Sequence, residues 1–434
     1  MAADPRSTRL ELTADERDML NGARGPAYAL AMTVVNKMAE VAGAERLIEI
    51  SGAHIDSCLY HGTVGLDFAE RLAGDGATVA VPTTLNVSAL DLLHPELIRH
   101  DQTTQDRARR LMDAYVAMGG RPTWTCAPYQ LPERPALGEH VAWAESNAIV
   151  FANSVLGART GRYGDFIDIC AAITGRVPLA GLHLDDARRA RIVFRLADDV
   201  RAAVERADPR DELYGLVGHI VGRRAGSQVP AVEGLPRDTT EDQLKELGAA
   251  AASSGAVALC HVVGVTPEAP TLADACGGAQ PVAEVLIDAG ALNEAWDELS
   301  TWRGTAALGA VSIGTPHASR AELERLVELL AGRRVHDGLA MYVSTGRDTL
   351  GALDGVVVER LADARITVVV DTCTYITPIL GSLGGRAVMT DSAKWAWYAP
   401  GNMGIEVVYG AMADCVESAV AGRIIRERPS YLDG

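Results

Sequence analysis

The chain has 434 residues, of which 48% are hydrophobic and 22% charged, so it is long enough to form two or three packed regions. Its 57 acidic residues outnumber its 40 basic residues, and the formal net charge of -17 argues against a long basic surface for nucleic acid or anionic lipid. The composition therefore predicts a small molecule as ligand, with no nucleic acid and no membrane as partner.

No apolar run approaches the roughly 20 residues that cross a bilayer, and the N-terminal segment lacks the apolar core of a signal peptide. Seven cysteines are scattered through the chain without any Cys-x-x-Cys pair, which is unlike a secreted disulfide framework. We therefore expect a cytoplasmic protein with reduced thiols, in which most cysteines are small buried hydrophobic residues.

The first half of the chain predicts alternating helices and strands. Thr13 and Glu16 have the spacing of a capping box, which indicates the start of a helix. Short apolar strands are expected at 46–56 and 77–87, with a helix at 66–76 between them. This order is typical of an α/β protein.

The middle of the chain combines expected binding loops with a candidate domain boundary. Residues 121–187 are rich in Gly, Pro and Asn, which favours binding loops, and the charged residues 188–212 favour a solvated helix. Turn-forming residues gather near 222–238, before a new helix. We therefore expect two regions: an N-terminal α/β region over 1–225, with site loops at 51–62 and 121–165, and a C-terminal α/β region over 226–434.

Short apolar runs alternate with helical stretches throughout the second half, which favours a largely parallel sheet with right-handed crossovers. The runs lie at 256–264, 306–314, 338–346, 366–375 and 386–394. Ligands of such sheets gather at the carboxyl ends of the strands. Chemically useful groups lie near the ends of several runs: Cys260 and His261, Thr315 and His317, Ser344 and Arg347, Cys373, and Ser392 and Lys394. Packing alone explains any one of these groups, but it explains their recurrence at strand ends less well.

Cys126 lies in the segment TWTCAPYQ, residues 123–130, between two hydroxyl-bearing residues and a proline. A catalytic thiolate, a metal ligand and a buried apolar side chain are all compatible with this setting. Cys373 has a similar setting in a distant segment, and iron sites can use cysteines that only folding brings together. The spacing leaves all three interpretations open.

Seven segments share a family resemblance: VPTTLNV (81–87), TWTCAPYQ (123–130), GEHVAWAESNAIVFANSVLGART (138–160), HVVGVTPEA (261–269), GTPHAS (314–319), VVVDTC (368–373) and MTDSAKWAWYAP (389–400). In this order they resemble the large subunit, or catalytic region, of aconitase X, over about residues 8 to 420. That family consists of iron–sulfur hydro-lyases of the aconitase superfamily. The resemblance implies an aconitase-like multi-region α/β fold with largely parallel sheets, lacking the small swivelling domain.

The resemblance further implies that Cys126 and Cys373 hold an iron–sulfur cluster. Archaeal relatives have a cysteine where this chain has Thr315, and a hydroxyl is a poor replacement for a thiolate. Cys58 is the preferred third ligand, because it follows an expected strand and has histidines and an aspartate nearby, and Cys260 is the second choice.

Dehydration of a β-hydroxy acid requires removal of a weakly acidic proton beside a carboxylate and loss of hydroxide. An iron site can act as a Lewis acid on the hydroxyl group, while cations hold the carboxylate. Arg159 and Lys394 are candidate carboxylate anchors, with a surface charge or a structural ion pair as the alternative. The further candidates are His54, Glu145, Ser146 and Asn147 for substrate binding, and Ser392, Lys394 and His317 for catalysis. Their structural alternatives are helix caps, loop hydrogen bonds and buried histidines.

The family includes bacterial cis-3-hydroxy-L-proline dehydratases and archaeal mevalonate 5-phosphate dehydratases. TWTCAPYQ and HIDSCLYHG (54–62) resemble bacterial members more than archaeal ones, which favours the first activity. The second activity, or dehydration of another small hydroxy acid, is the alternative. Two other classes stay open: a metal-free enzyme with Cys126 as nucleophile and His54 or His140 as base, and a non-catalytic subunit without a cluster. Only RIIRERPSYLDG (423–434) follows the last apolar segment, so we also expect a separately encoded small subunit with the swivelling domain.

Overall fold

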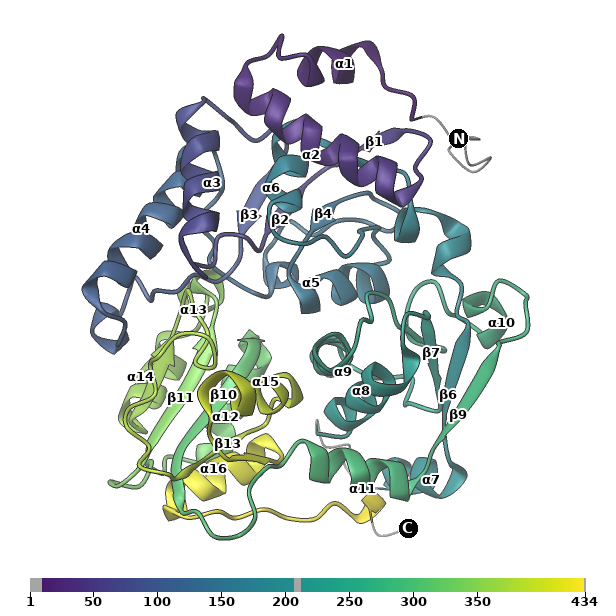
Figure 1. Ribbon diagram of the computed structural model, residues 1–434. Helices are drawn as coiled ribbons and strands as arrows, with labels where there is room; N and C mark the ends of the chain where they lie inside the picture. The colour runs from purple at the N-terminus through teal and green to yellow at the C-terminus, as the bar shows by residue number, and fades with distance from the viewer. Residues whose placement is uncertain (1–9, 207–211, 433–434) are drawn as a thin grey trace.

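The computed structural model describes residues 10–206 and 212–432 of the chain, and Figure 1 shows three regions, one above and two below. Each region contains one sheet, of three, four and five strands respectively, and a separate pair of strands lies beside the first. All pairings within the three larger sheets are parallel, so the fold is α/β with largely parallel sheets, as the sequence predicts. Within the described part, no helix is both long and apolar enough to cross a membrane.

The N-terminal region shares one small sheet and consists, in chain order, of α1 (Ala14–Leu20), α2 (Pro26–Ala42), β1 (Leu47–Glu49), β2 (Ala53–Ile55), α3 (Thr63–Gly74), β3 (Thr83–Leu85), α4 (Gln102–Ala117), β4 (Ala142–Trp143), α5 (Ser146–Phe151), α6 (Ile167–Thr174) and β5 (Arg176–Pro178). The sheet has the order β3-β2-β4, and β2 is buried along its whole length, as is typical of a parallel strand with covered faces. The predicted capping box of Thr13 and Glu16 is present at the start of α1. α6 packs on α2 and β2, and α3 packs on α4.

The middle region is built on a four-stranded sheet and consists of β6 (Ile192–Leu196), α7 (Asp198–Arg206), α8 (Glu212–Ala225), β7 (Pro230–Glu233), α9 (Glu241–Ser254), β8 (His261–Val262), α10 (Leu272–Ala275), β9 (Ala283–Ile287) and α11 (Ala289–Glu298). Its order is β8-β7-β6-β9. The solvated helix expected over 188–212 is wrong at its centre, because β6 lies there between β7 and β9. The branched and aromatic side chains of Val193 and Phe194 are fully buried in this sheet, whereas the charged residues on both sides suggested a helix.

The C-terminal region is built on a five-stranded sheet and consists of β10 (Leu308–Ala318), α12 (Arg320–Leu330), β11 (Ala340–Thr345), α13 (Arg347–Gly351), α14 (Gly355–Asp363), β12 (Ile366–Val369), β13 (Ala387–Thr390), α15 (Ala393–Met403), β14 (Val407–Tyr409) and α16 (Met412–Ala421). Its order is β12-β11-β10-β13-β14. Side chains alternate between the two faces of a strand, so Val311 packs in the core with α12 and α16, whereas Ala310 packs on the face that α15 covers. Four of the five apolar runs predicted for the second half form this parallel sheet, whereas the run at 256–264 supplies β8 of the four-stranded sheet.

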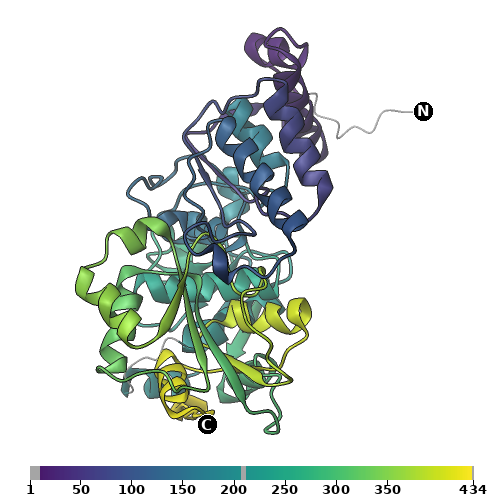
Figure 2. The same cartoon turned by 90° about the vertical axis from the view of Figure 1, so that its left-hand side faces the viewer.

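The N-terminal region is stacked above the five-stranded sheet in Figure 2. Two hydrogen bonds to Asp371 join these regions: the amide of Ser88 donates to its backbone carbonyl over 2.7 Å, and the amide of Leu92 donates to its side-chain carboxylate over 3.0 Å. The segments after β3 and after β12 therefore meet at one boundary. The expected division of the chain at residue 225 stays a prediction; the four-stranded sheet takes strands from both sides of that position.

Helices α8 and α9 approach each other closely through glycines. A Cβ atom added at Gly218 would lie 2.2 Å from the carbonyl oxygen of Leu247, and one added at Gly222 would lie 2.7 Å from the carbonyl oxygen of Ala251. Neither contact can be relieved by a side-chain rotation, because the neighbouring atoms belong to the backbone of α9. Glycine at these positions therefore sets the distance between the two helices.

We expect Gly218→Ala to lower the free energy of unfolding by about 1–3 kcal/mol, because overpacking pushes α8 and α9 apart. Gly65→Ala in α3 is the matched control: nothing lies within 4 Å of the added methyl group. Helix propensity predicts that this control is stabilised, by up to about 1 kcal/mol. Denaturant unfolding of both variants measures the difference, and equal stability of the two would contradict close packing as the reason for Gly218.

Candidate metal centre and active site

Two cysteines and a histidine from distant segments meet in the core between the N-terminal and C-terminal regions. The possible ligand atoms of Cys126, His317 and Cys373 all lie within 4.8 Å of one another, and all three residues are buried. Cys126 lies in the loop between α4 and β4, His317 near the end of β10, and Cys373 just after β12. Thiolate and imidazole ligands together suit zinc, copper and iron.

The surroundings of Cys126 favour its thiolate form. Burial opposes ionisation, but a hydrogen bond from Cys373 and the charges of His317 and Lys394 outweigh it and lower the pKa of Cys126 to about 6. The backbone amide of His317 also donates a hydrogen bond to the Cys126 sulfur over 3.2 Å. The same thiol–thiol hydrogen bond, together with burial, raises the pKa of Cys373. The pair therefore holds one negative charge readily and a second one only with a cation beside it.

The imidazole of His317 is held in place on both sides. Its Nδ1 lies 3.1 Å from the hydroxyl of Thr125, and its Nε2 lies 3.1 Å from the carbonyl oxygen of Thr372. Gln130 donates a further hydrogen bond to the carbonyl of His317 over 2.9 Å. The neighbours of both cysteines in sequence thus orient the histidine, which links the three segments into one unit.

A buried ion pair lies beside this unit. Lys394, in the first turn of α15, donates to the carboxylate of Glu145 over 2.5 Å, and both side chains are less than a tenth exposed. Burial alone would raise the pKa of Glu145, but Lys394 outweighs it and lowers that pKa; Glu145 in turn raises the pKa of Lys394 against the effect of burial. Both groups are therefore ionised at neutral pH. Ser146 lies 3.4 Å from the same ammonium group.

Glu145 and Asn147 also connect the ion pair to Cys126. Glu145 is the N-cap of α5 and accepts from the amide of Ala148 over 2.8 Å, as the cap alternative in the sequence anticipated. The amide nitrogen of Asn147 donates to the carbonyl of Cys126 over 3.0 Å, and its oxygen accepts from Tyr129 over 2.6 Å. Asn147 therefore holds the Cys126 loop against α5.

His54 and Asp56, at the carboxyl end of β2, form a second polar group close enough to Glu145 to feel its charge. His54 on β2 is fully buried, and burial lowers its pKa to about 4, so its imidazole is neutral at pH 7. Its Nδ1 lies 2.8 Å from the hydroxyl of Thr84, whereas no described residue hydrogen-bonds its Nε2. Asp56 follows β2, and burial together with the charges of Glu145 and other carboxylates raises its pKa to about 8.

The other cysteine candidates lie outside the group of Cys126, His317 and Cys373. The thiol of Cys58 donates to the carbonyls of Ile55 and Asn86, each over 3.3 Å, and burial with neighbouring carboxylates raises its pKa. Burial alone raises the pKa of Cys260 to about 12, and its backbone amide donates to Ser154 over 2.9 Å. The role of Cys58 as third ligand stays a prediction, and the structure places His317 rather than Cys58 beside the cysteine pair.

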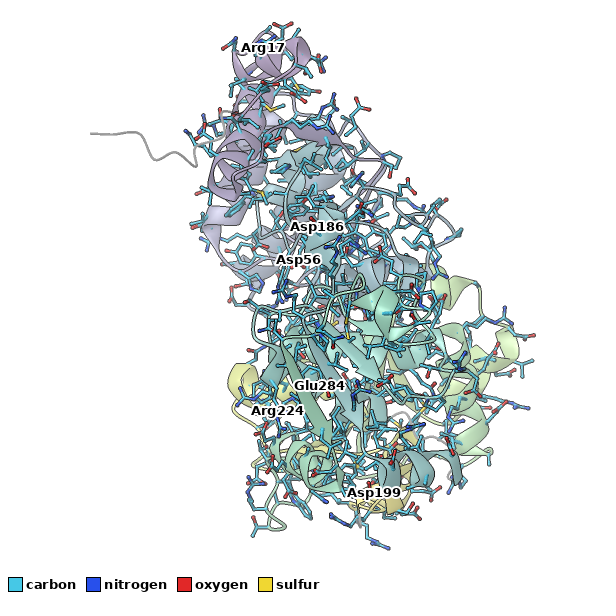
Figure 3. The ribbon with its side chains drawn as sticks, turned by 90° about the vertical axis from the view of Figure 1, so that its right-hand side faces the viewer. Arg17, Asp56, Asp186, Asp199, Arg224 and Glu284 are labelled. Atoms are coloured by element: carbon cyan, nitrogen blue, oxygen red, sulfur yellow. The ribbon has the colours of Figure 1, made fainter. Side chains whose placement is uncertain are left out.

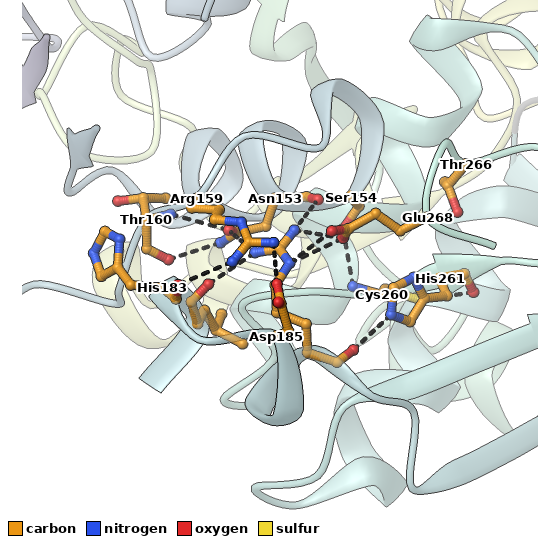
Figure 4. Close-up of polar contacts among 12 residues, drawn as sticks. Asn153, Ser154, Arg159, Thr160, His183, Asp185, Cys260, His261, Thr266 and Glu268 are labelled. Atoms are coloured by element: carbon orange, nitrogen blue, oxygen red, sulfur yellow. Dashed lines mark hydrogen bonds and ion pairs between the residues drawn. The ribbon is translucent and has the colours of Figure 1, made fainter. Parts of the chain in front are cut away.

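Ser392 and Arg159 both take part in contacts that maintain the fold. Ser392 is the N-cap of α15: its hydroxyl accepts from the amide of Trp395 over 3.1 Å and donates to the carbonyl of Thr315. Arg159 donates to the carbonyl of His183 over 3.0 Å and pairs with Asp185, as Figure 4 shows. These are the helix-cap and ion-pair alternatives that the sequence left open, and neither contact excludes substrate binding.

Sequence reasoning did not single out Asn86 or Asp168. Asp168, at the start of α6, is fully buried, and its carboxylate accepts from the amides of Asp56 and Ser57 over 2.8 and 2.9 Å. Asn86 directly follows β3, and its side-chain amide donates to Asp56. The position of Asn86 after an apolar strand was a usable signal, whereas nothing in the segment DFIDIC distinguishes Asp168 from a solvated helix residue.

We expect Lys394→Met to lower the free energy of unfolding by about 3–5 kcal/mol, because it leaves the Glu145 carboxylate buried without its counter-charge. The double variant Lys394→Met, Glu145→Gln should recover a large part of this loss. Arg320→Met, which breaks the exposed ion pair with Glu324, is the control and should leave stability nearly unchanged. Denaturant titration measures all three, and an additive double variant would mean that the pair is not coupled.

Comparison with known proteins relates the whole chain to one family. Family models match in order: aconitase X first domain over residues 9–186, second domain over 190–297 and third domain over 308–421. A cis-3-hydroxy-L-proline dehydratase of Pseudomonas aeruginosa is 42% identical over 97% of this chain and 72% of that protein, and one of Hypocrea jecorina is 40% identical over 98% and 71%. A phosphomevalonate dehydratase large subunit of Methanosarcina mazei is 34% identical over 95% of this chain and 98% of that protein.

A solved structure agrees with these matches. The crystal structure of Thermococcus kodakaraensis aconitase X in its holo-form superposes with a TM-score of 0.83 at 29% sequence identity, over 94% of this chain and all of that one. The match spans all three sheets, so the two proteins share their overall architecture as well as short sequence segments. The chain belongs to the aconitase X family.

Proposed function

We propose that this chain is the catalytic part of a hydro-lyase that removes water from cis-3-hydroxy-L-proline. The observation behind the proposal is that two dehydratases of this substrate are 42% and 40% identical over nearly the whole chain. The segments that surround Cys126, Glu145 and Lys394 lie within the matched regions. The scattered reduced cysteines and the composition support a cytoplasmic location as part of the same proposal.

The cysteine and histidine group fits an iron–sulfur cluster as cofactor. Cys126 and Cys373 supply two sulfur ligands, the lowered pKa of Cys126 favours the thiolate that iron requires, and His317 offers an imidazole nearby. When bound, the cluster would supply a Lewis acid for the hydroxyl group that leaves the substrate. Burial of the three side chains would keep bulk water away from that hydroxyl group.

The protein residues beside this group can bind the substrate and stabilise charge. Removal of the proton next to the substrate carboxylate builds negative charge on that carboxylate, and the ammonium of Lys394 can stabilise it. Glu145 keeps Lys394 protonated and fixes its position. Ser146 and the free Nε2 of His54 can hydrogen-bond the substrate, and Ser392 and His317 stay candidates for moving the proton.

A phosphorylated hydroxy acid is the second candidate substrate. The chain matches phosphomevalonate dehydratase large subunits of Methanosarcina mazei and Methanothermobacter thermautotrophicus over 98% and 96% of their length, compared with 72% and 71% for the two hydroxyproline dehydratases. These relatives are named large subunits, which supports a small subunit as partner, whose domain would close over the substrate.

We expect anaerobically reconstituted protein to convert cis-3-hydroxy-L-proline and to leave mevalonate 5-phosphate unchanged. Product formation from each substrate, measured with and without the candidate small subunit, tests both parts of the proposal. Turnover of mevalonate 5-phosphate alone would favour the second candidate. Full activity of the chain by itself would contradict the need for a small subunit.

We expect Cys126→Ser and Cys373→Ser each to lose most of the bound iron and the visible absorbance, because a neutral hydroxyl binds iron far more weakly than a thiolate. Cys276→Ser is the matched control, since Cys276 is buried but lies in the middle region beside α10. Comparing iron in Cys58→Ser and His317→Ala then identifies the third ligand. A stoichiometric cluster in the double variant of Cys126 and Cys373 would contradict the assignment.

A further inference from the structure

Two neighbouring strands of the N-terminal sheet end in an acceptor pair that the proposed catalytic chemistry does not use. Asp56 directly follows β2, Asn86 directly follows β3, and these strands are hydrogen-bonded in parallel. Glu145 follows β4 on the other side of β2. Because adjacent strands lie about 4.8 Å apart, the three side chains form a row along the carboxyl edge of the sheet. Figure 3 labels Asp56 near the middle of the molecule.

The Asn86 side chain has a determined orientation and a spare acceptor. Its amide nitrogen donates to the Asp56 carboxylate, so its oxygen Oδ1 takes no part in that contact. This oxygen is buried, and none of the residues that the structure describes donates a hydrogen bond to it. A buried carbonyl oxygen without a donor costs free energy, so a donor from outside the chain is expected there.

Within the described ranges, Asp56 has no cationic partner, and with a pKa of about 8 its carboxyl group is mostly protonated at pH 7 while no cation lies beside it. Among the residues of the described part, no basic side chain lies within 4 Å of it, whereas Glu145, Asp165 and Asp168 surround it with negative charge. Lys394, the nearby base, is already paired with Glu145. The Asp56 carboxyl group and Asn86 Oδ1 are therefore two adjacent polar groups that lack a positively charged neighbour from the described chain, which a bound ammonium would supply.

We propose that Asp56 and Asn86 bind the ring ammonium of the amino-acid substrate and thereby select a hydroxyproline over a phosphorylated hydroxy acid. The inference rests on the proposed function. The protonated ring nitrogen of a proline has two N–H donors, which match the Asp56 carboxylate and Asn86 Oδ1. The substrate carboxylate is attached to the carbon next to this nitrogen, so it lies toward Glu145 and Lys394, where the ammonium of Lys394 can hold it. A substrate with a phosphate and no cation would leave Asp56 and Asn86 without a partner, and the Glu145 carboxylate would repel its phosphate.

The test compares two ligands in the reconstituted full chain, under the conditions in which the wild-type protein turns over. One is cis-3-hydroxy-L-proline, and the other is its carbocyclic analogue cis-2-hydroxycyclopentane-1-carboxylate, in which a methylene replaces the ammonium, used as a competitive inhibitor. Asp56→Asn should lower kcat/KM for hydroxyproline on the order of 100-fold, because a desolvated charge pair is lost. It should leave the inhibition constant of the analogue and the iron content within threefold of wild type.

Two further variants separate the contact from its surroundings. Asp165→Asn removes one exposed negative charge near Asp56 and should change kcat/KM less than threefold. Asn86→Ala removes only the neutral acceptor and should raise KM for hydroxyproline about tenfold without affecting the analogue. If Asp56→Asn does not fold, Asn86→Ala still tests the ammonium contact.

The possible outcomes distinguish the inference from the proposed function. If the wild-type protein turns over hydroxyproline and Asp56→Asn keeps kcat/KM within threefold of wild type, the ammonium site is wrong and the proposed function stands. The same holds if Asp56→Asn weakens kcat/KM for hydroxyproline and binding of the analogue by equal factors. Absence of hydroxyproline turnover in the wild-type protein, with or without its small subunit, would overturn both.

Discussion

The buried ion pair between Lys394 and Glu145 is the interaction on which the arrangement of the site depends. Lys394 belongs to the first turn of α15 in the C-terminal region, and Glu145 caps α5 in the N-terminal region. An unpaired charge at either position costs several kcal/mol in a low-dielectric interior, so each region is stable in its place only when the other supplies the partner. The same alignment of the two regions brings Cys126 against Cys373 and His317. Packing of the two regions against each other therefore both positions the thiols and buries the charges.

Much of the fold could be predicted from local pattern. Apolar runs that end near residues such as His317 and Lys394 indicated parallel strands with polar groups at their carboxyl ends, because strand length, turn residues and crossover handedness are local properties. β6 was missed, because its short buried run lies between charged stretches that resemble a helical face. The pairing of Cys126 with Cys373 came from family resemblance rather than from spacing, since no local pattern encodes a contact between distant loops.

The candidate site shows why residue type alone does not identify a function. Arg159 and Lys394 are both basic residues in polar segments, and the sequence offered both as carboxylate anchors. Arg159 pairs with the exposed Asp185 and with a backbone carbonyl, whereas Lys394 is buried against Glu145 beside the thiols. The neighbours that folding brings to Arg159 and Lys394 decide which of them lies beside the thiols. These neighbours come from distant segments, so the sequence alone does not identify them. The third ligand is a similar case, because His317 reaches the cysteine pair from a strand end whereas Cys58 turns toward backbone carbonyls.

The charge balance of the site bears on the choice between the two substrates. Cys126 favours a thiolate and Glu145 is ionised, while Lys394 is already engaged by Glu145. An iron–sulfur cluster held by Cys126 and Cys373, as proposed, would offset part of this negative charge. The edge formed by Asp56 and Asn86 has no such offset from within the described part, so a zwitterion can place its cation there and its carboxylate toward Lys394. In the proposed site, the substrate preference of this chain therefore depends on whether the ligand brings a positive charge to Asp56 and Asn86.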